Sequence, residues 1–246
     1  MVKILDCTTR DGGHDTNWNF DKNFVESLIL CLNKTGIQYY EIGYRNNLDR
    51  KNKGEFYYCD PEFLHQFSSI KKGLNIGVMV DTSRFCINDF QDGKKDFADF
   101  VRIATHPDKI RITLDYAHEL HNKNYKVIVQ LMEIPNVNEE HYKILENWEH
   151  KEILECLYIA DSYSTVTPSE IKTYFDKLKS IGYKRISFHA HDKHSLALQN
   201  TLKAIELGAY SVDVTLNGMG KNLDAIKLLE NTTKYNSKYY KELSLL

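Results

Sequence analysis

The sequence predicts a single (β/α)8 barrel, the TIM-barrel fold, and three observations lead to this prediction. Eight short apolar runs alternate with eight helical segments along 246 residues, which is the length of one such barrel. No Gly-x-Gly-x-x-Gly follows the first apolar run, so an open dinucleotide-binding sheet has no specific support. No solenoid repeat, low-complexity linker or internal boundary divides the chain. We therefore expect one domain over residues 1–246.

The expected strands are short apolar runs bounded by turn-forming residues. In chain order they cover residues 3–7, 39–43, 75–80, 100–104, 126–132, 156–160, 185–188 and 211–216. The helical stretches that can be delimited between them cover residues 24–33, 61–69, 109–122, 140–148, 168–182, 195–207 and 223–232. Three of these end at a glycine, Gly36, Gly182 or Gly208, and another opens on Pro168 with Glu170 in its first turn.

The composition excludes several classes of function. A net charge of −2 and a pI near 6.6 give no electrostatic footprint for nucleic-acid binding. No apolar run approaches the ~20 residues of a membrane span, and no signal segment opens the chain. The five cysteines are odd in number and contain no Cys-x-x-Cys pair, which argues against a zinc ribbon or a redox pair. We therefore expect a cytoplasmic protein that binds neither nucleic acid nor membrane.

A pair of histidines, His189 and His191, ends the seventh expected strand. Residues i and i+2 of a strand point to the same face, so the two imidazoles lie side by side. Imidazole nitrogen is the commonest protein ligand of divalent metals. Taken alone, such a pair is more often an incidental feature of a strand end. Asp11, after the first strand, could complete a two-histidine, one-carboxylate set with open positions, which with oxygen ligands added suits Mn²⁺ or Mg²⁺.

Active sites of barrels gather at the carboxyl ends of the strands. Carboxylate, imidazole and guanidinium groups are expected to converge on this end of the barrel. The barrel fold alone does not require them there, so they indicate a functional site. The polar residues at these ends are Arg10, Asp11, His14, Glu41, Tyr44, Arg45, Asp81, His106, Gln130, Asp161, His189, His191, Thr215 and Asn217.

Four motifs, in order and at barrel spacing, give the sequence a family resemblance over about residues 3–230. They are LDCTTRDGGH at 5–14, VRIATH at 101–106, ADSYSTVTP at 160–168, and HAHD at 189–192 followed by GMG at 218–220. The chain resembles the pyruvate-type metal-dependent aldolases and lyases, which include 4-hydroxy-2-oxovalerate aldolase, 3-hydroxy-3-methylglutaryl-CoA (HMG-CoA) lyase and the isopropylmalate synthases. It is most similar to the 4-hydroxy-2-oxovalerate aldolase branch, because the synthases carry Arg-Asp-Gly-Glu-Gln where this chain has Arg-Asp-Gly-Gly-His at 10–14.

The resemblance implies a role for each motif residue. Asp11, His189 and His191 would hold Mn²⁺ or Mg²⁺, on which a 2-oxo acid chelates through its carboxylate and carbonyl oxygens. His14 would take the proton of the 4-hydroxyl group, and Arg10 would stabilise the pyruvate enolate oxygen. The reaction would cleave or form a carbon–carbon bond between pyruvate and an aldehyde. Further residues expected to contact substrate are Tyr44, Arg45, His106, Thr215 and Asn222.

Departures from the family pattern leave several points open. The Gly218–Asn222 loop is shorter than its counterparts, so Asn222 replaces the usual loop ligand only if the loop reaches the metal. The family's C-terminal helical domain is not expected here, so docking to an aldehyde dehydrogenase, and acetaldehyde as substrate, are in doubt. Residues 45–58 are expected to determine which aldehyde binds, and their tyrosines and lysines suggest a polar, phosphorylated or sugar-like partner. A homo-oligomer is possible.

Two alternative functions stay open at this stage. One is a Claisen-type acyl-CoA condensing or cleaving enzyme, which the Gly13-His14 pair and the lack of an evident CoA module disfavour. The other is a catalytically silent barrel that serves as a binding subunit, supported by the shortened glycine loop. Against it stands the joint presence of Arg10, Asp11, His14 and the two histidines.

Overall fold

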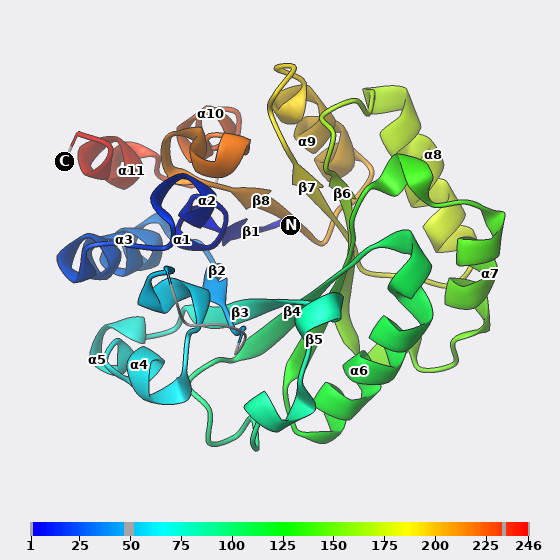
Figure 1. Cartoon of the computed structure of the whole chain (residues 1–246). Helices are drawn as coiled ribbons and strands as arrows, with labels where there is room; N and C mark the ends of the chain where they lie inside the picture. Colours follow the sequence, from blue (N-terminus) through cyan, green and yellow to red (C-terminus); the bar gives the residue numbers. More distant parts are fainter. Residues whose placement is uncertain (1, 47–51, 233–234, 246) are drawn as a thin grey trace.

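Eight parallel strands close into a barrel in this computed structural model, which describes residues 2–46, 52–232 and 235–245 (Figure 1). Each strand pairs with the next in the chain, and β8 pairs back to β1. The predicted (β/α)8 fold is therefore confirmed. The strands are β1 Lys3–Asp6, β2 Tyr39–Tyr44, β3 Asn75–Asp81, β4 Phe100–Thr105, β5 Lys126–Leu131, β6 Leu154–Asp161, β7 Ile186–Ala190 and β8 Ser211–Val214.

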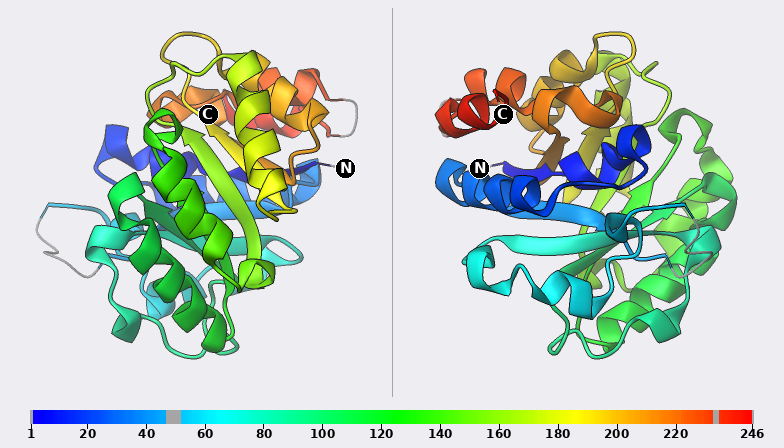
Figure 2. Two further views of the ribbon diagram at one scale, coloured as in Figure 1. Left: turned by 90° about the vertical axis from the view of Figure 1, so that its right-hand side faces the viewer. Right: turned by 60° about the vertical axis from the view of Figure 1, so that its left-hand side comes forward.

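The longer helices wrap the outside of the barrel, whereas the single-turn α1 and α2 lie at the carboxyl end of β1, and the last helix, α11, packs beside α3 (Figures 1 and 2). Their order matches the predicted alternation, although the stretch 61–69 divides into two short helices. The α-helices are α1 Thr8–Asp11, α2 Gly13–Thr16, α3 Lys22–Thr35, α4 Pro61–His65, α5 Ser68–Lys71, α6 Ile110–Asn122, α7 Glu139–Asn147, α8 Pro168–Ser180, α9 Ala197–Glu206, α10 Ala225–Glu230 and α11 Lys238–Leu243.

Eight helical segments were expected, but one of the connections between strands, from β3 to β4, contains no α-helix. Between β3 and β4, where every residue is described, the chain forms only the 3-10 turns η2 (Thr82–Arg84) and η3 (Ile87–Asp89). Residues 88–96 are dominated by Asp, Asn, Lys and Gly and carry no apolar stripe at helical spacing. The connection is therefore an irregular loop.

Local signals fix the helix ends where the sequence predicts them. Asp21 caps α3 by accepting a hydrogen bond from the Phe24 amide, and Gly36 ends this helix at a φ of +83°. Thr167 and Glu170 form a capping box at the start of α8. These caps set where each helix turns back toward the barrel.

The barrel interior is layered, and the layers place the site. Along β4, alternate side chains point inward: Phe100 lies lowest, Arg102 above it, and Ala104 at the mouth. The lowest layer is apolar and includes Leu5, Tyr39, Phe100, Ile128, Cys156 and Tyr158. The layer above it is charged and consists of Glu41, Arg102 and Asp213. The side chains at the barrel mouth therefore lie above a buried layer of ion pairs, which itself lies above the apolar layer.

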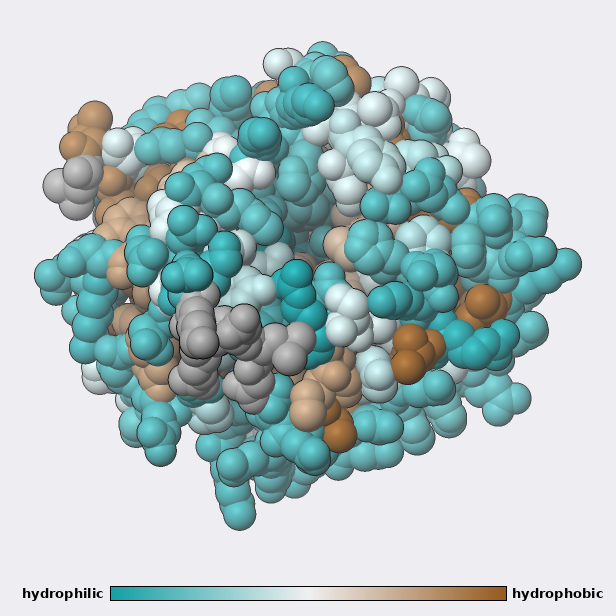
Figure 3. Space-filling model, viewed as in Figure 1, coloured by the Kyte–Doolittle hydropathy of each residue, from teal (hydrophilic) through white to brown (hydrophobic). Residues whose placement is uncertain are grey.

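The face at the strand ends is mostly hydrophilic and is hollowed near its middle (Figure 3). Over the described parts of the chain, we find no helix with the length and apolar character required to cross a bilayer.

Candidate active site

Asp11, His189 and His191 meet at the barrel mouth. Asp11 is carried by the single helical turn α1 that follows β1, whereas the two histidines come from the end of β7. One potential ligand atom from each of the three lies within 4.8 Å of the others. The Nε2 atom of His189 is 3.5 Å from Oδ2 of Asp11, and the imidazole centroids are 5.0 Å apart. The geometry therefore brings together the three predicted metal ligands.

The protonation states of Asp11 and His191 at neutral pH favour the binding of a cation. Burial alone would raise the pKa of Asp11, but the Arg10 guanidinium and the two neighbouring imidazoles hold it well below its ordinary range. Burial, aided by the proximity of His189, lowers the pKa of His191 to about 4. At neutral pH the site thus presents a carboxylate and an uncharged His191 ring with a free lone pair.

Asp213 on β8 fixes the orientation of His189. This role was not predicted from the sequence. Its Oδ2 atom lies 2.8 Å from Nδ1 of His189 and accepts a hydrogen bond from Nη1 of Arg102 at 2.6 Å. Burial would raise the pKa of Asp213, but Arg102 and His189 outweigh it and lower that pKa. The ionised carboxylate therefore keeps the proton on Nδ1 and turns Nε2 toward Asp11. The feature of the sequence that could have indicated this role is an acidic residue, Asp213, on β8, the strand that pairs with β7.

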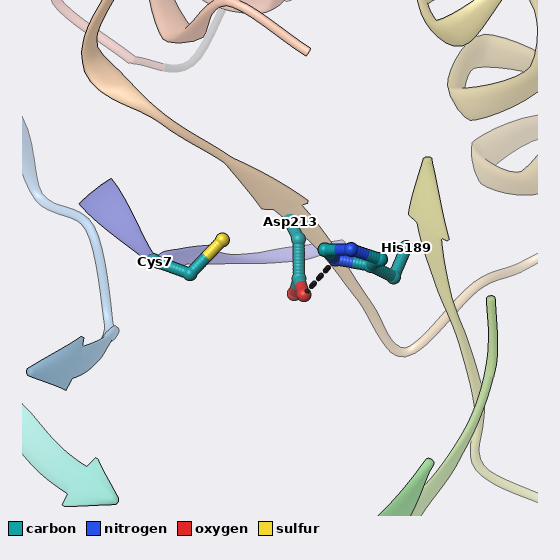
Figure 4. Close-up of side chains that lie close together, drawn as sticks. All are labelled: Cys7, His189 and Asp213. Atoms are coloured by element: carbon teal, nitrogen blue, oxygen red, sulfur yellow. Dashed lines mark hydrogen bonds and ion pairs between the residues drawn. The ribbon is translucent and has the colours of Figure 1, made fainter. Parts of the chain in front are cut away.

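Figure 4 shows Cys7, at the end of β1, beside this His189–Asp213 pair. The three also form a geometrically possible metal group. However, burial raises the pKa of the Cys7 thiol well above its ordinary value, and Asp213 already accepts hydrogen bonds from two partners. We therefore interpret this group as the support beneath the mouth site.

A chain of buried ion pairs connects Arg10 with this support. The Glu41 carboxylate accepts hydrogen bonds from Nε of Arg10 at 2.5 Å and from Nε of Arg102 at 2.6 Å. Arg10 also pairs with Asp11, Nη1 to Oδ1, at 2.7 Å. Three carboxylates (Asp11, Glu41, Asp213) against two guanidiniums leave a formal charge of −1. Within the described chain, Nη2 of Arg10 is buried and has no hydrogen-bond partner.

His14 lies on α2 above the metal-ligand group. Its Nε2 is 3.9 Å from Oδ1 of Asp11, and 59% of its side chain is exposed. Partial desolvation of the ring lowers the pKa of His14, so the ring is available as a proton acceptor at neutral pH. The ring packs edge-on against Trp18, with centroids 4.7 Å apart, and faces Tyr44 at 6.5 Å.

Trp18 holds this corner in place and escaped sequence reasoning. Its indole N–H donates to the Arg10 carbonyl at 2.8 Å. A Cβ atom on Gly13 would lie 2.1 Å from the indole Nε1, so only glycine fits there. The paired glycines before His14 were the signal for this close approach.

The mouth encloses a cavity of about 570 Å³, which Tyr44 and His106 line as expected. Arg45 does not line it, and its expected contact with substrate is corrected. Its guanidinium donates to both oxygens of Asp96, at 2.6 and 3.1 Å, and to the Cys59 carbonyl at 3.1 Å. The side chain is only 2% exposed and points outward from β2 because it follows Tyr44 by one residue. Within the 45–58 loop, residues 47–51 lie outside the described part of the chain.

Thr215 is likewise corrected, whereas Asn222 reaches the site. The Thr215 hydroxyl is fully buried and donates to the Met219 carbonyl at 2.9 Å, so it shapes the glycine loop instead of facing the cavity. Asn222 Nδ2 donates to Oδ2 of Asp11 at 2.7 Å. Its Oδ1 atom is buried and finds no partner among the residues that the structure describes. The short loop therefore brings the Asn222 amide group to the carboxylate, with its nitrogen in contact with Asp11.

Comparison with known proteins agrees with this geometry. The sequence model of the HMGL-like family matches residues 108–231, half of the chain. The chain is 28% identical over 225 residues to a 4-hydroxy-2-oxovalerate aldolase of Carboxydothermus hydrogenoformans, covering 89% of this chain and 66% of that protein. It is 24% identical over 220 residues to an oxaloacetate decarboxylase of Mycobacterium tuberculosis, covering 89% and 65%. The chain thus spans about two thirds of the length of these relatives.

Solved structures show the same fold. The N-terminal domain of a proposed aldolase from Bacteroides vulgatus superposes with a TM-score of 0.89 at 27% identity, covering 99% of this chain and 85% of that one. The HMG-CoA lyase of Brucella melitensis shares the fold alone, with a TM-score of 0.77 at 15% identity and coverage of 99% and 96%. Together with the family match, these findings confirm the resemblance expected from the sequence: the chain belongs to the HMGL-like family.

Proposed function

We propose that this protein is a divalent-metal-dependent aldolase that cleaves or forms a carbon–carbon bond between pyruvate and an aldehyde. Its substrate or product would be a 4-hydroxy-2-oxo acid. The observation that carries the proposal is the convergence of Asp11, His189 and His191 on a cavity that Arg10 also lines, with the Nη2 atom of Arg10 left unpaired among the described residues. The names of the 4-hydroxy-2-oxovalerate aldolase relatives support this class of reaction.

The residues present fit a hard divalent cation. They offer one ionised carboxylate, two imidazole nitrogens and the unpaired amide oxygen of Asn222, a mixture that suits Mn²⁺ or Mg²⁺. The formal charge of −1 in the ionic layer favours a cation at the mouth. When bound, the ion supplies a Lewis acid that polarises the carbonyl group of a 2-oxo acid.

The protein's own residues perform the remaining tasks. Glu41 and Asp11 fix the Arg10 guanidinium, so its free Nη2 is oriented to donate to the oxygen that becomes the enolate. In the cleavage direction His14 accepts the proton of the 4-hydroxyl group. The C3–C4 bond then breaks, and its electron pair passes to the pyruvate enolate while the aldehyde carbonyl forms. A proton delivered to C3 completes pyruvate.

Oxaloacetate decarboxylation is a second candidate, favoured by the name of the Mycobacterium tuberculosis relative. Loss of carbon dioxide would leave the same pyruvate enolate beside Arg10. It requires no base for a hydroxyl proton, so it gives His14 no task. Release of pyruvate from oxaloacetate at a rate that His14→Ala leaves unchanged would favour this second function.

Deuterium exchange into the methyl group of pyruvate tests the main proposal, because it needs the enolate but no aldehyde. Incubation with Mn²⁺ in heavy water, followed by proton NMR, is expected to show loss of the methyl signal. The exchange should disappear with a chelator and in His189→Ala, whereas His65→Ala, which removes an exposed histidine on α4, should behave as wild type. Absence of exchange with every divalent metal tried would refute the proposal.

A further inference from the structure

We propose that the aldehyde partner is an uncharged, polyhydroxylated aldehyde, held by the wall of the cavity that faces the metal ligands. This inference rests on the proposed aldolase function and specifies its second substrate.

The wall in question comes from the carboxyl ends of β3, β4, β5 and β6. Its polar side chains are Asp81 at the end of β3, His106 after β4, Gln130 on β5, Glu133 after β5 and Ser162 after β6, and the apolar Met79, Ala104 and Met132 lie among them. In this proposal, a pyruvate held at the metal ligands directs its methyl carbon toward the open volume between the two walls. The aldehyde that bonds to this carbon therefore projects its remaining carbons toward these five polar side chains.

The side-chain carbonyl oxygen of Gln130 can accept a hydrogen bond that no described residue supplies. Its side chain lines the cavity, is only 4% exposed, and has an Oε1 atom that no described residue hydrogen-bonds. Ser162 complements it, because its oxygen already accepts from the Glu133 amide at 3.0 Å, which leaves its hydroxyl hydrogen free to donate. A substrate hydroxyl both donates and accepts, and so matches this pair.

An apolar aldehyde would fit this wall poorly. It would offer no donor to the Gln130 carbonyl oxygen, which is already buried and unpaired among the described residues, and buried polar groups left unpaired are costly. Sites built to bind a hydroxyl group reject analogues that lack it strongly. The cavity of about 570 Å³ also exceeds what a two-carbon aldehyde fills.

An anionic aldehyde is disfavoured by charge. The wall carries two carboxylates, Asp81 and Glu133, whereas the lysine and the arginine that line the cavity, Lys221 and Arg10, belong to the Gly218–Asn222 loop and to α1 on the side of the metal ligands. Its one basic group, His106, lies 3.4 Å from a Glu133 oxygen and is occupied by that carboxylate. A phosphate or carboxylate group on the aldehyde would face net negative charge there.

A panel of aldehydes separates these classes. With Mn²⁺ and saturating pyruvate, kcat/KM is measured for glyceraldehyde, glyceraldehyde 3-phosphate and 2-methylbutanal, which replaces both hydroxyls of glyceraldehyde by methyl groups. We expect glyceraldehyde to exceed each of the others by about 10- to 100-fold. Equal or faster turnover of 2-methylbutanal, or a preference for the phosphate, would overturn the inference.

Two variants test the named residues. Gln130→Met should reduce the preference for glyceraldehyde over 2-methylbutanal by about tenfold, while the control Gln199→Met, exposed on α9, should leave that ratio unchanged. Glu133→Gln should raise turnover of glyceraldehyde 3-phosphate relative to glyceraldehyde. An unchanged ratio in both variants contradicts the inference.

The pyruvate exchange assay distinguishes a failure of the proposed substrate class from a failure of the aldolase function. Methyl exchange without preference for glyceraldehyde would refute the substrate class alone. Absence of exchange would refute the aldolase function and this inference with it.

Discussion

Asp213 determines which nitrogen of His189 faces the metal ligands, through the hydrogen bond to Nδ1 at 2.8 Å. Outer partners of this kind orient the ligand and raise its basicity. We expect Asp213→Asn to weaken Mn²⁺ binding by about 10- to 100-fold, measured by calorimetric titration. Asp176→Asn, an exposed change on α8, is the control. Unchanged affinity in Asp213→Asn would show that His189 is oriented without it.

Gly13 is required by the indole of Trp18. The Gly13→Ala side chain would meet Trp18 Nε1 at 2.1 Å, so either the indole or the α2 backbone must move. We expect a loss of about 1–3 kcal/mol in unfolding free energy, measured by urea denaturation. Gly73→Ala is the matched control, because none of the described residues comes within 4 Å of its Cβ position. Equal stability of the two variants would contradict the tight contact.

Single residues also show where sequence reasoning succeeds and fails. The positions of Asp11, His14, His189 and His191 follow from strand ends, which local patterns reveal. Arg45 is adjacent to Tyr44 but belongs to another environment, because its partner Asp96 lies 51 residues away. A pairing over such a distance depends on the closed fold and leaves no local signal.

At the level of elements, the β3–β4 connection is the part of the barrel without an α-helix, and Asp96 anchors it. Its carboxylate accepts hydrogen bonds from Arg45, the Tyr125 hydroxyl and the Ala98 amide. The Asp96 side chain is 1% exposed. We expect Asp96→Asn to lower the unfolding free energy by about 3–5 kcal/mol, because the Arg45 charge is left buried and uncompensated.

The pH dependence of this ion pair has a definite sign. Burial would raise the pKa of Asp96, but Arg45 outweighs it, so the folded-state pKa lies below the ordinary value of about 3.9. The stabilisation is therefore present above about pH 4 and lost as the pH falls through the folded-state pKa. Denaturation curves of wild type and Asp96→Asn should converge in acid. A stability difference that stays constant into acid would contradict this assignment.

Element prediction works where a hydrophobic pattern and caps agree. The strands and long helices from α6 to α9 lie within a few residues of the expected ranges. The single-turn helices α1 and α2 were not expected, because four residues carry too short a pattern to detect. These two turns carry Arg10, Asp11 and His14, so the end of β1 predicted where these residues lie, whereas their helical conformation was not predictable.

For the whole molecule, metal binding should add to the free energy of unfolding by mass action. At Mn²⁺ one hundred times above its dissociation constant, the gain is about 2.7 kcal/mol, seen as a rise in melting temperature. His189→Ala should lose this rise, and His65→Ala should retain it. A rise of equal size in both variants would place the bound ion elsewhere.

The overall fold was predictable because eight strands at regular spacing leave few alternatives. The buried ionic layer was not, since Glu41, Arg102 and Asp213 come from β2, β4 and β8 and meet only inside the closed barrel. That layer fixes both Arg10 and His189, and the proposed chemistry depends on it.

The most direct test of the central claim is methyl exchange of pyruvate in heavy water, followed as Mn²⁺ is added. The account predicts that exchange rises with Mn²⁺, saturates with the same midpoint as calorimetric binding, and is lost in His189→Ala. Exchange that proceeds equally well without metal, or unchanged in His189→Ala, would contradict it.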